Sequence, residues 1–384
     1  MHFRRSLLFF FAVTPLAFAA ETSVPAQPKN KASAGVVAQW TQDPKTPETA
    51  TWLAERMLAA QANGRPEIAQ KLQDLLHAGN VAAPCAQDGS FFFTMRGPGE
   101  KQASIYRRRG VEGKDERLVD AQKLGAGKKV SLEILDLATD GSLLVYGLGE
   151  GKGDDRTVHV FDVNAGHDLP DVLPPARYHT ASIAPDKKGF YYSKVAPAGT
   201  RIFFHPFGAD PATDKYVFGE TYNYEPLGPK DLISTKVTEN GEYLLLSVRR
   251  GGETKRVDVY SQEQDEPDQR VRPIIHAMND DFVVINHGKD LFVLTDNAAP
   301  KKRVIKLMID DPTPEKWEVI VPESEDTLSA ISIVGKQLFV TASHAGTART
   351  RIFTLAGKEI GQITSPALEF SQAVFHTCPN AAHE

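Results

Sequence analysis

A turn followed by a short apolar run recurs six times along this chain of 384 residues, and this repeat limits the possible folds more than any other feature. The runs follow glycines at steps of 52, 48, 52, 47 and 47 residues, and these glycines are Gly89, Gly141, Gly189, Gly241, Gly288 and Gly335. A fixed period of roughly 40–50 residues carried by strand-like units is typical of the blades of a β-propeller. The spacing therefore predicts an all-β propeller with six recognisable blade repeats.

The residues within each repeat indicate a hairpin that is packed on both faces. Asp88-Gly89 and Asn240-Gly241 favour tight turns between antiparallel strands. The strands that follow, such as Leu143-Leu144-Val145, are apolar at consecutive positions, so neither face suits water. Composition agrees with a globular protein, since 41% of the residues are hydrophobic and 24% are charged. The formal net charge of -5 argues against a basic stripe, so we expect no nucleic-acid partner.

Residues 1–20 have the pattern of a secretory signal peptide. Arg4 and Arg5 form a basic start, residues 7–13 form a short apolar core, and Ala17-Phe18-Ala19 matches an A-x-A cleavage motif. A membrane-spanning helix needs about 20 apolar residues, and this core is shorter. We therefore predict export from a bacterial cell, to the periplasm or beyond, with no membrane association after cleavage. An uncleaved membrane anchor is the alternative.

Three segments follow the signal, and composition distinguishes them. Residues 21–39 are rich in Ala, Pro, Ser and Lys, which is typical of a linker. Residues 40–80 predict two helices, of which Pro66 opens the second and Gly79 ends it. Strand patterns then continue to the end, so residues 85–384 are predicted to be the propeller, incomplete at its C-terminal end. The first helix is predicted from the spacing of Thr49, Trp52, Leu53, Arg56, Met57 and Ala60.

The chain has two cysteines, Cys85 and Cys378, one before the first repeat and one after the sixth. Two thiols in an oxidising compartment can pair. A propeller brings its first and last blades together, so a disulfide here would clasp the ring. The alternative is two unrelated thiols, because spacing alone does not place their Cα atoms within bonding range.

Several stretches, in order, resemble the prolyl oligopeptidase family of serine peptidases. Residues 166–173, GHDLPDVL, are similar to the family pattern GKELPDVL, and residues 183–193 follow with a match to its "D-G-K-G-F-Y-Y-S" stretch. The opening Trp40-Thr41-Gln42-Asp43-Pro44 and the later Trp317-Glu318-Val319-Ile320-Val321-Pro322-Glu323 are similar to further family segments. The resemblance extends from Trp40 to about Pro366.

This resemblance implies a seven-bladed propeller that sits over an α/β-hydrolase domain and admits peptides while excluding folded proteins. It also implies cleavage after proline by a Ser-Asp-His triad in the hydrolase domain. The present sequence ends at Glu384, where a seventh repeat would be due, and it contains no G-x-S-x-G nucleophile elbow. We therefore assign no catalytic residue and no cofactor, and we expect this chain to be inactive by itself.

Other groups of polar residues favour structural interpretations. His167, Asp168 and Asp171 could be metal ligands, but a solvated loop between blades is favoured, so no metal residue is assigned. Residues 147–153 are rich in glycine but lack the G-x-x-x-x-G-K-[ST] phosphate motif, which favours a flexible loop between strands.

Three basic residues and two histidines also favour ordinary positions. Arg107-Arg108-Arg109 has no interleaved aromatic residues and is expected to be a solvated face. His276 and His287 lie near predicted strand edges and are expected to fill surface or core positions.

Three functions remain as hypotheses. The first is the substrate-gating propeller of a prolyl-oligopeptidase-like endopeptidase, whose partners are a peptide substrate and a separate hydrolase domain. The second is an exported, non-catalytic propeller that binds a peptide or protein. The third is an enzyme with an unrecognised site on the propeller. An incomplete ring has unpaired strand edges, so self-association is also expected.

Overall fold

The structure is a computed structural model that describes residues 70–71, 74, 78–151, 153–222, 225–252, 254–265, 270–344 and 347–363. The chain divides into two compact units, Met1–Gln73 and Asp74–Glu384, and nearly all described residues belong to the second. The predicted signal peptide, the linker and most of the helical segment lie outside the described residues. Within the described part, no helix is long and apolar enough to cross a membrane.

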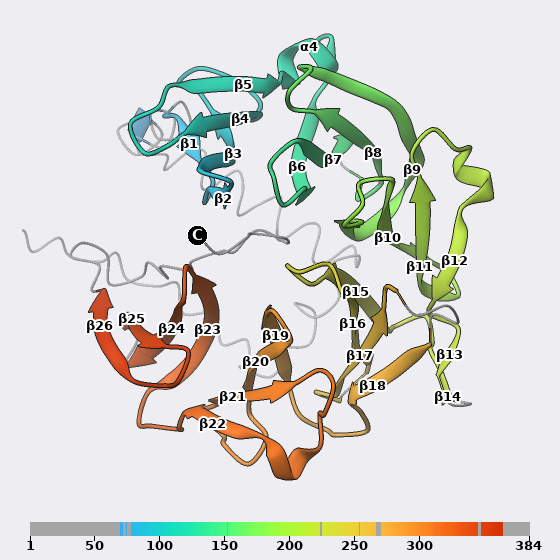
Figure 1. Cartoon of the computed structure of the whole chain (residues 1–384). Coiled ribbons are helices and arrows are strands. Elements are labelled where there is room, and N and C mark those ends of the chain that lie inside the picture. The colour runs from blue at the N-terminus through green and yellow to red at the C-terminus, as the bar shows by residue number, and fades with distance from the viewer. Residues whose placement is uncertain are drawn as a thin grey trace, which may run out of the picture. The chain divides into compact units, whose positions relative to one another are not determined.

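The described strands of the second unit form antiparallel sheets that follow one another around a common centre in chain order (Figure 1). We refer to six blades, numbered along the chain. Blade 1 comprises β1 (Asn80–Val81), β2 (Cys85–Gln87), β3 (Ser90–Arg96), β4 (Ser104–Arg109) and β5 (Asp115–Val119), with β1 and β2 both paired to β3. A short helix, α4 (Ala121–Gly125), leads to blade 2 and is capped by Asp120, whose side chain accepts from the amides of Gln122 and Lys123.

Blades 2 and 3 share one long strand, β9 (His167–Ile183). Its first part pairs with β8, and its last part, from Arg177 onward, pairs with β10. One strand is therefore the outer strand of blade 2 and then the inner strand of blade 3. The remaining strands are β6 (Val130–Leu137), β7 (Leu143–Glu150) and β8 (Arg156–Asp162) in blade 2, and β10 (Gly189–Ala196), β11 (Gly199–Pro206) and β12 (Lys215–Phe218) in blade 3, which also contains the 3-10 turn η1 (Pro211–Thr213).

Blades 4, 5 and 6 are four-stranded sheets with strands in sequence order. Blade 4 contains β15 (Leu232–Val237), β16 (Tyr243–Arg249), β17 (Val257–Glu263) and β18 (Val271–Ile275), and the hairpin of β13 (Thr221–Tyr222) and β14 (Glu225–Pro226) precedes it. Blade 5 contains β19 (Phe282–His287), β20 (Asp290–Thr295), β21 (Arg303–Met308), the 3-10 turn η2 (Pro314–Lys316) and β22 (Glu318–Val321). Blade 6 contains β23 (Thr327–Val334), β24 (Gln337–His344), β25 (Thr347–Thr354) and β26 (Glu359–Ile363).

Glycines occupy the predicted turns in five of the six repeats. Gly89, Gly141, Gly241, Gly288 and Gly335 have positive φ values between 53° and 74°. Gly189 instead begins β10, and Lys187 takes the left-handed conformation of that turn with φ 53°. A Cβ atom on Gly189 would lie 2.3 Å from the carbonyl oxygen of His205, so this glycine is needed for close strand approach rather than for turning.

Five apolar cores join successive blades. The core between blades 1 and 2 contains Phe92 and Tyr146, and the core between blades 3 and 4 contains Tyr191 and Leu244, which is fully buried. Further cores lie between blades 2 and 3, 4 and 5, and 5 and 6. Among the described residues no such core joins blade 6 to blade 1, so the described sheets do not close into a ring. The fold prediction of an incomplete propeller is thereby confirmed.

Polar side chains on the innermost strands add hydrogen bonds between blades. Asp136 on β6 accepts the amide of Ile183 on β9 at 2.7 Å, and Ser182 on β9 accepts the amide of Val237 on β15 at 2.8 Å. Both acceptors are completely buried, so an unmade bond would leave a desolvated amide without a partner. These contacts fix the height of each inner strand against the next.

Cys85 on β2 is disulfide-bonded. The only other cysteine of the sequence, Cys378, lies outside the described residues. A disulfide between Cys85 and Cys378 that joins the ends of the propeller remains a prediction.

Replacing Ser182 tests the bond between blades 3 and 4. Ser182→Ala removes the acceptor for the Val237 amide, and we expect a loss of about 1–3 kcal/mol in the free energy of unfolding. Urea titration followed by tyrosine and tryptophan fluorescence measures it. The control is Ser329→Ala, an exposed serine on β23, for which a change within about 0.5 kcal/mol is expected. Equal effects of the two variants would contradict the role given to Ser182.

Candidate functional site

The inner wall of blade 4 presents a lysine that is half-buried beside two cavities. Lys236 lies on β15 opposite Leu245, whose side chain belongs to the apolar core between blades 4 and 5. Residues directly opposite each other on antiparallel strands share a face, so Lys236 faces blade 5. On β19 of blade 5, Asn286 is paired with Leu291 of the same core and therefore faces back toward Lys236.

The first cavity, of about 200 Å³, lies along the inner strand β15 and extends to residues of both neighbouring blades. Its lining comes from blade 3 through Thr180, from blade 4 through five residues and from blade 5 through Val284 and Asn286. The five from blade 4 are Ser234, Thr235, Lys236, Leu245 and Ser247. We call it the Lys236 cavity.

Two buried polar atoms at the Lys236 cavity are unsatisfied. Nδ2 of Asn286, which is 2% exposed, has no hydrogen-bond partner within the described residues, and neither has Oγ1 of Thr235, which is 4% exposed. Buried polar groups without partners are rare in proteins and call for an explanation.

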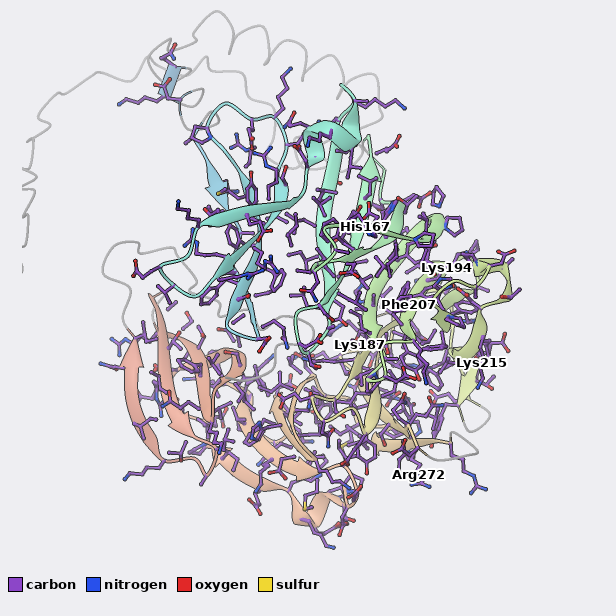
Figure 2. All side chains as sticks on the ribbon, turned by 45° about the horizontal axis from the view of Figure 1, so that its top comes forward. His167, Lys187, Lys194, Phe207, Lys215 and Arg272 are labelled. Atoms are coloured by element: carbon purple, nitrogen blue, oxygen red, sulfur yellow. The ribbon has the colours of Figure 1, made fainter. Side chains whose placement is uncertain are left out.

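A second cavity, of about 190 Å³, lies on the other side of Lys236 at the turns of blades 2, 3 and 4. Thr139, Pro185, Lys187 and Glu239 are among its lining residues, and Lys236 contributes to both cavities. Lys187 forms an ion pair at 2.5 Å with Asp140 on the neighbouring turn. Figure 2 labels this lysine together with Lys215, which belongs to β12 of the same blade.

The charge of Lys236 is not neutralised by direct contact. Burial lowers the pKa of its ammonium group, while the carboxylates of Asp136 and Glu239 oppose that shift. Asp136 is occupied by the Ile183 amide, and Oε2 of Glu239 lies 3.5 Å from Nδ1 of His287. Within the described part of the chain, the Lys236 ammonium makes no ion pair or hydrogen bond, and Lys236 lines both cavities.

Lys236 also differs in hydrogen-bonding chemistry from the residues at the equivalent position of blades 2 and 3. Asp136 and Ser182 occupy the equivalent position in those blades, on the innermost strand and facing the next blade. Both are acceptors that bind the next inner strand, whereas an ammonium group can only donate. At this position blade 4 therefore offers a donor where blades 2 and 3 offer an acceptor.

Comparison with known proteins identifies the fold. Residues 37–377 match the family model described as "Prolyl oligopeptidase, N-terminal beta-propeller domain". The chain belongs to the prolyl oligopeptidase family. The resemblance seen in the sequence is thus confirmed, and the matched part of the family is the propeller.

Individual members of the prolyl oligopeptidase family agree with this assignment. A prolyl endopeptidase from Elizabethkingia miricola is 23% identical over 344 residues, which cover 85% of this chain and 47% of that protein. A solved structure from a study of two prolyl endopeptidases has a TM-score of 0.71 and 28% identity, covering 85% of this chain and 50% of that one. Prolyl oligopeptidase B from Galerina marginata, with a TM-score of 0.65 and 18% identity, shares the fold. The chain spans about half the length of the curated relatives it matches most extensively.

The structure does not bring together the three residues considered as metal ligands, His167, Asp168 and Asp171. His167 is exposed at the start of β9, and Asp168 accepts from the hydroxyl of Tyr146 at 3.1 Å. Asp171 is buried and accepts the amide of Gly208. The expected solvated loop is wrong, because residues 167–183 form the long strand shared by two blades. Among the described residues, no group of three or more His, Cys, Asp or Glu side chains is arranged to hold a metal ion.

The glycine-rich stretch is a strand rather than a flexible loop. Gly147 and Gly149 lie within β7, and Gly151 forms the following turn, while Lys152 lies outside the described residues. A Cβ atom on Gly147 would lie 2.8 Å from Cδ of Arg156, so the glycine leaves room for that side chain. The expectation of a loop is therefore wrong for the residues of β7.

The basic triplet is only partly solvated. Arg107 is 6% exposed and donates to one carboxylate oxygen of Glu116 from Nε and Nη2, at 3.1 and 2.6 Å. Arg108 pairs with Asp115 at 2.7 Å. Acids on the neighbouring strand β5 pair with Arg107 and Arg108, while Arg109 is exposed, so the expected solvated face is wrong for Arg107.

The two histidines occupy ordinary positions. Nδ1 of His276 lies 3.0 Å from the hydroxyl of Tyr260, directly after β18, and His287 is the last residue of β19. Both are half-buried, as the sequence suggested.

A buried charged cluster was missed in the sequence. His205 on β11 is completely buried, with Nδ1 at 2.7 Å from Asp214 and Nε2 at 3.2 Å from Asp171. The hydroxyl of Tyr192 donates to the other oxygen of Asp214 at 2.8 Å. Both ring nitrogens lie within hydrogen-bonding distance of carboxylate oxygens, so the buried imidazole links Asp171 to Asp214. The sequence held no signal, since the three residues are up to 43 positions apart (Asp171 to Asp214).

Replacing His205 tests this cluster. His205→Leu keeps a similar volume but leaves two buried carboxyl groups without their hydrogen-bond partner, so we expect a loss of about 3 kcal/mol or more in stability. Thermal and urea unfolding followed by circular dichroism measures it. His167→Leu, at the exposed start of β9, is the control, with an expected change within about 0.5 kcal/mol. A His205 variant as stable as the control would show that the contacts of His205 with Asp171 and Asp214 do not stabilise the protein.

Proposed function

We propose that these residues form the substrate-gating propeller of a prolyl-oligopeptidase-like serine endopeptidase. The observation that carries the proposal is the match of residues 37–377 to the family's N-terminal propeller, supported by a prolyl endopeptidase structure of which this chain covers 50%. The proposed role is selection of peptides by size, while a hydrolase part performs the cleavage.

The chemistry of the sequence supports this division of labour. A serine hydrolase of the α/β class places its nucleophile in a G-x-S-x-G turn beside an oxyanion hole, and none of the 384 residues forms that motif. The buried charged cluster around His205 is fully enclosed and stabilises a blade. We therefore place the peptide-bond chemistry in a hydrolase part, either continuous with these residues or on a separate chain.

A second candidate is an exported propeller that binds a peptide or protein without catalysis. The Lys236 cavity favours it, because the cavity has unsatisfied polar groups and is independent of any hydrolase. Both candidates use the same inner wall, and the presence or absence of turnover with a hydrolase part separates them.

Complementation tests the first candidate. The purified chain is mixed with, or fused to, the hydrolase part of the Elizabethkingia miricola prolyl endopeptidase, and release of p-nitroaniline from Z-Gly-Pro-p-nitroanilide is followed. We expect no turnover by the propeller alone, and turnover of short peptides but not of folded proteins in the assembly. Peptides of increasing length define the size limit.

Two results would contradict that proposal. One is hydrolysis by the 384-residue chain alone, abolished by a serine-directed inhibitor. The other is an assembly that cleaves folded proteins as readily as short peptides. Sedimentation velocity of the chain alone is the control for self-association through the open ring, which remains a prediction and would appear as species heavier than a monomer.

We also propose that the chain is exported. Support comes from the basic start at Arg4 and Arg5, the apolar core of residues 7–13 and the Ala17-Phe18-Ala19 motif. Expression in a Gram-negative host should yield a periplasmic protein whose N-terminus, read by Edman sequencing, lies near Ala20 or Glu21. A protein recovered from the cytoplasm with residues 1–20 intact would refute export by a cleaved signal.

A further inference from the structure

We propose that the Lys236 cavity binds a carboxylate, namely the C-terminal carboxylate of a short peptide with an aliphatic last residue. The choice of a peptide rests on the proposed function, whereas the choice of a carboxylate rests on the cavity alone. The proposed site involves Lys236 and Asn286, which face each other between blades 4 and 5.

The size of the cavity argues for a ligand larger than a single water. A bound water needs only ~10–15 Å³, whereas this cavity measures about 200 Å³. One bridging water would satisfy Asn286 or Thr235 and leave most of the space unfilled. A carboxylate with a short side chain matches the space better.

The lining has the polarity that a carboxylate requires. Nδ2 of Asn286 and the ammonium of Lys236 are donors on facing strands, whereas Thr235 pairs with Leu246 and faces blade 3. None of the eight lining residues is acidic. Charge-assisted hydrogen bonds from such groups to a carboxylate are about twice as strong as neutral ones.

The apolar part of the lining indicates what is attached to the carboxylate. Leu245 belongs to the apolar core between blades 4 and 5, and Val284 packs against that core. Both residues line the cavity. They offer a surface for an aliphatic side chain next to the polar donors.

The acids near Lys236 do not occupy this site. Asp136 and Glu239 act on Lys236 from the side of blade 2 and of the turn after β15, and neither lines the cavity. Asp136 is bound by the Ile183 amide, and Glu239 has His287 at 3.5 Å. Burial lowers the pKa of Lys236, so a bound anion should raise it again and draw a proton onto the lysine.

Calorimetry with two matched peptides tests the proposal. N-acetyl-Gly-Pro-Leu with a free carboxylate and the same peptide with a C-terminal amide are titrated into the full chain. We expect saturable binding of the acid and at least ten-fold weaker binding of the amide. Repeating the titration at alkaline pH in buffers of different ionisation enthalpy should reveal proton uptake on binding of the acid.

Three variants locate the site. Lys236→Met and Asn286→Asp should each reduce affinity for the acid by ten-fold or more and abolish its advantage over the amide. Lys255→Met is the matched control, because this lysine is exposed, pairs with Asp296 and lies outside the cavity lining. The affinity of this variant for the peptide acid should equal that of the unmodified chain. Circular dichroism confirms that each variant folds, and the comparison of acid with amide on the unmodified chain needs no variant.

Equal binding of acid and amide, absence of binding by either, or undiminished discrimination by Lys236→Met would overturn the proposal. The outcome is separable from that of the gating function, because binding is measured on the propeller without a hydrolase. Failure here with successful complementation would leave the gating function intact. Carboxylate binding without complementation would favour a non-catalytic peptide-binding propeller.

Discussion

Packing of sheet against sheet is the interaction on which the rest of this structure depends. The central strands of each blade carry apolar side chains on both faces, as in β16, where Leu244 faces blade 3 and Leu245 faces blade 5. Burial of apolar surface contributes ~25 cal/mol per Å², so a blade gains its stability from its two neighbours rather than from its own hydrogen bonds. Among the described residues, blades 1 and 6 each have one such neighbour.

Polar contacts refine what apolar packing leaves undetermined. Apolar faces tolerate sliding, whereas the bonds from Asp136 to Ile183 and from Ser182 to Val237 define one height for each inner strand. At the third of these positions blade 4 has Lys236, which cannot accept a hydrogen bond and lines a cavity. The same position on the inner strand thus binds the next blade in blades 2 and 3, and it forms part of the proposed binding site in blade 4.

Much of the fold could be predicted, and little of the candidate site. The blades were visible because a turn residue and an apolar run recur locally, and local patterns survive in any tertiary context. The short-range errors have local physical causes. The sequence predicts a solvated loop around His167, Asp168 and Asp171, yet this stretch pairs with β8 as an edge strand, where a proline removes no ladder hydrogen bond. The sequence also predicts a solvated Arg107, yet Glu116 on the neighbouring strand pairs with its buried side chain.

By itself, the sequence determined the family, the all-β class, the number of recognisable repeats and the absence of a nucleophile elbow from these residues, because each is carried by residues adjacent in the chain. Only the tertiary structure decided which polar residues meet. His205 meets Asp171 and Asp214, and Lys236 meets a cavity lined by Asn286, because strands from different blades place them together. The register of strand pairing decides which neighbouring blade each side chain faces, and a shift of one residue would turn each side chain to the opposite face.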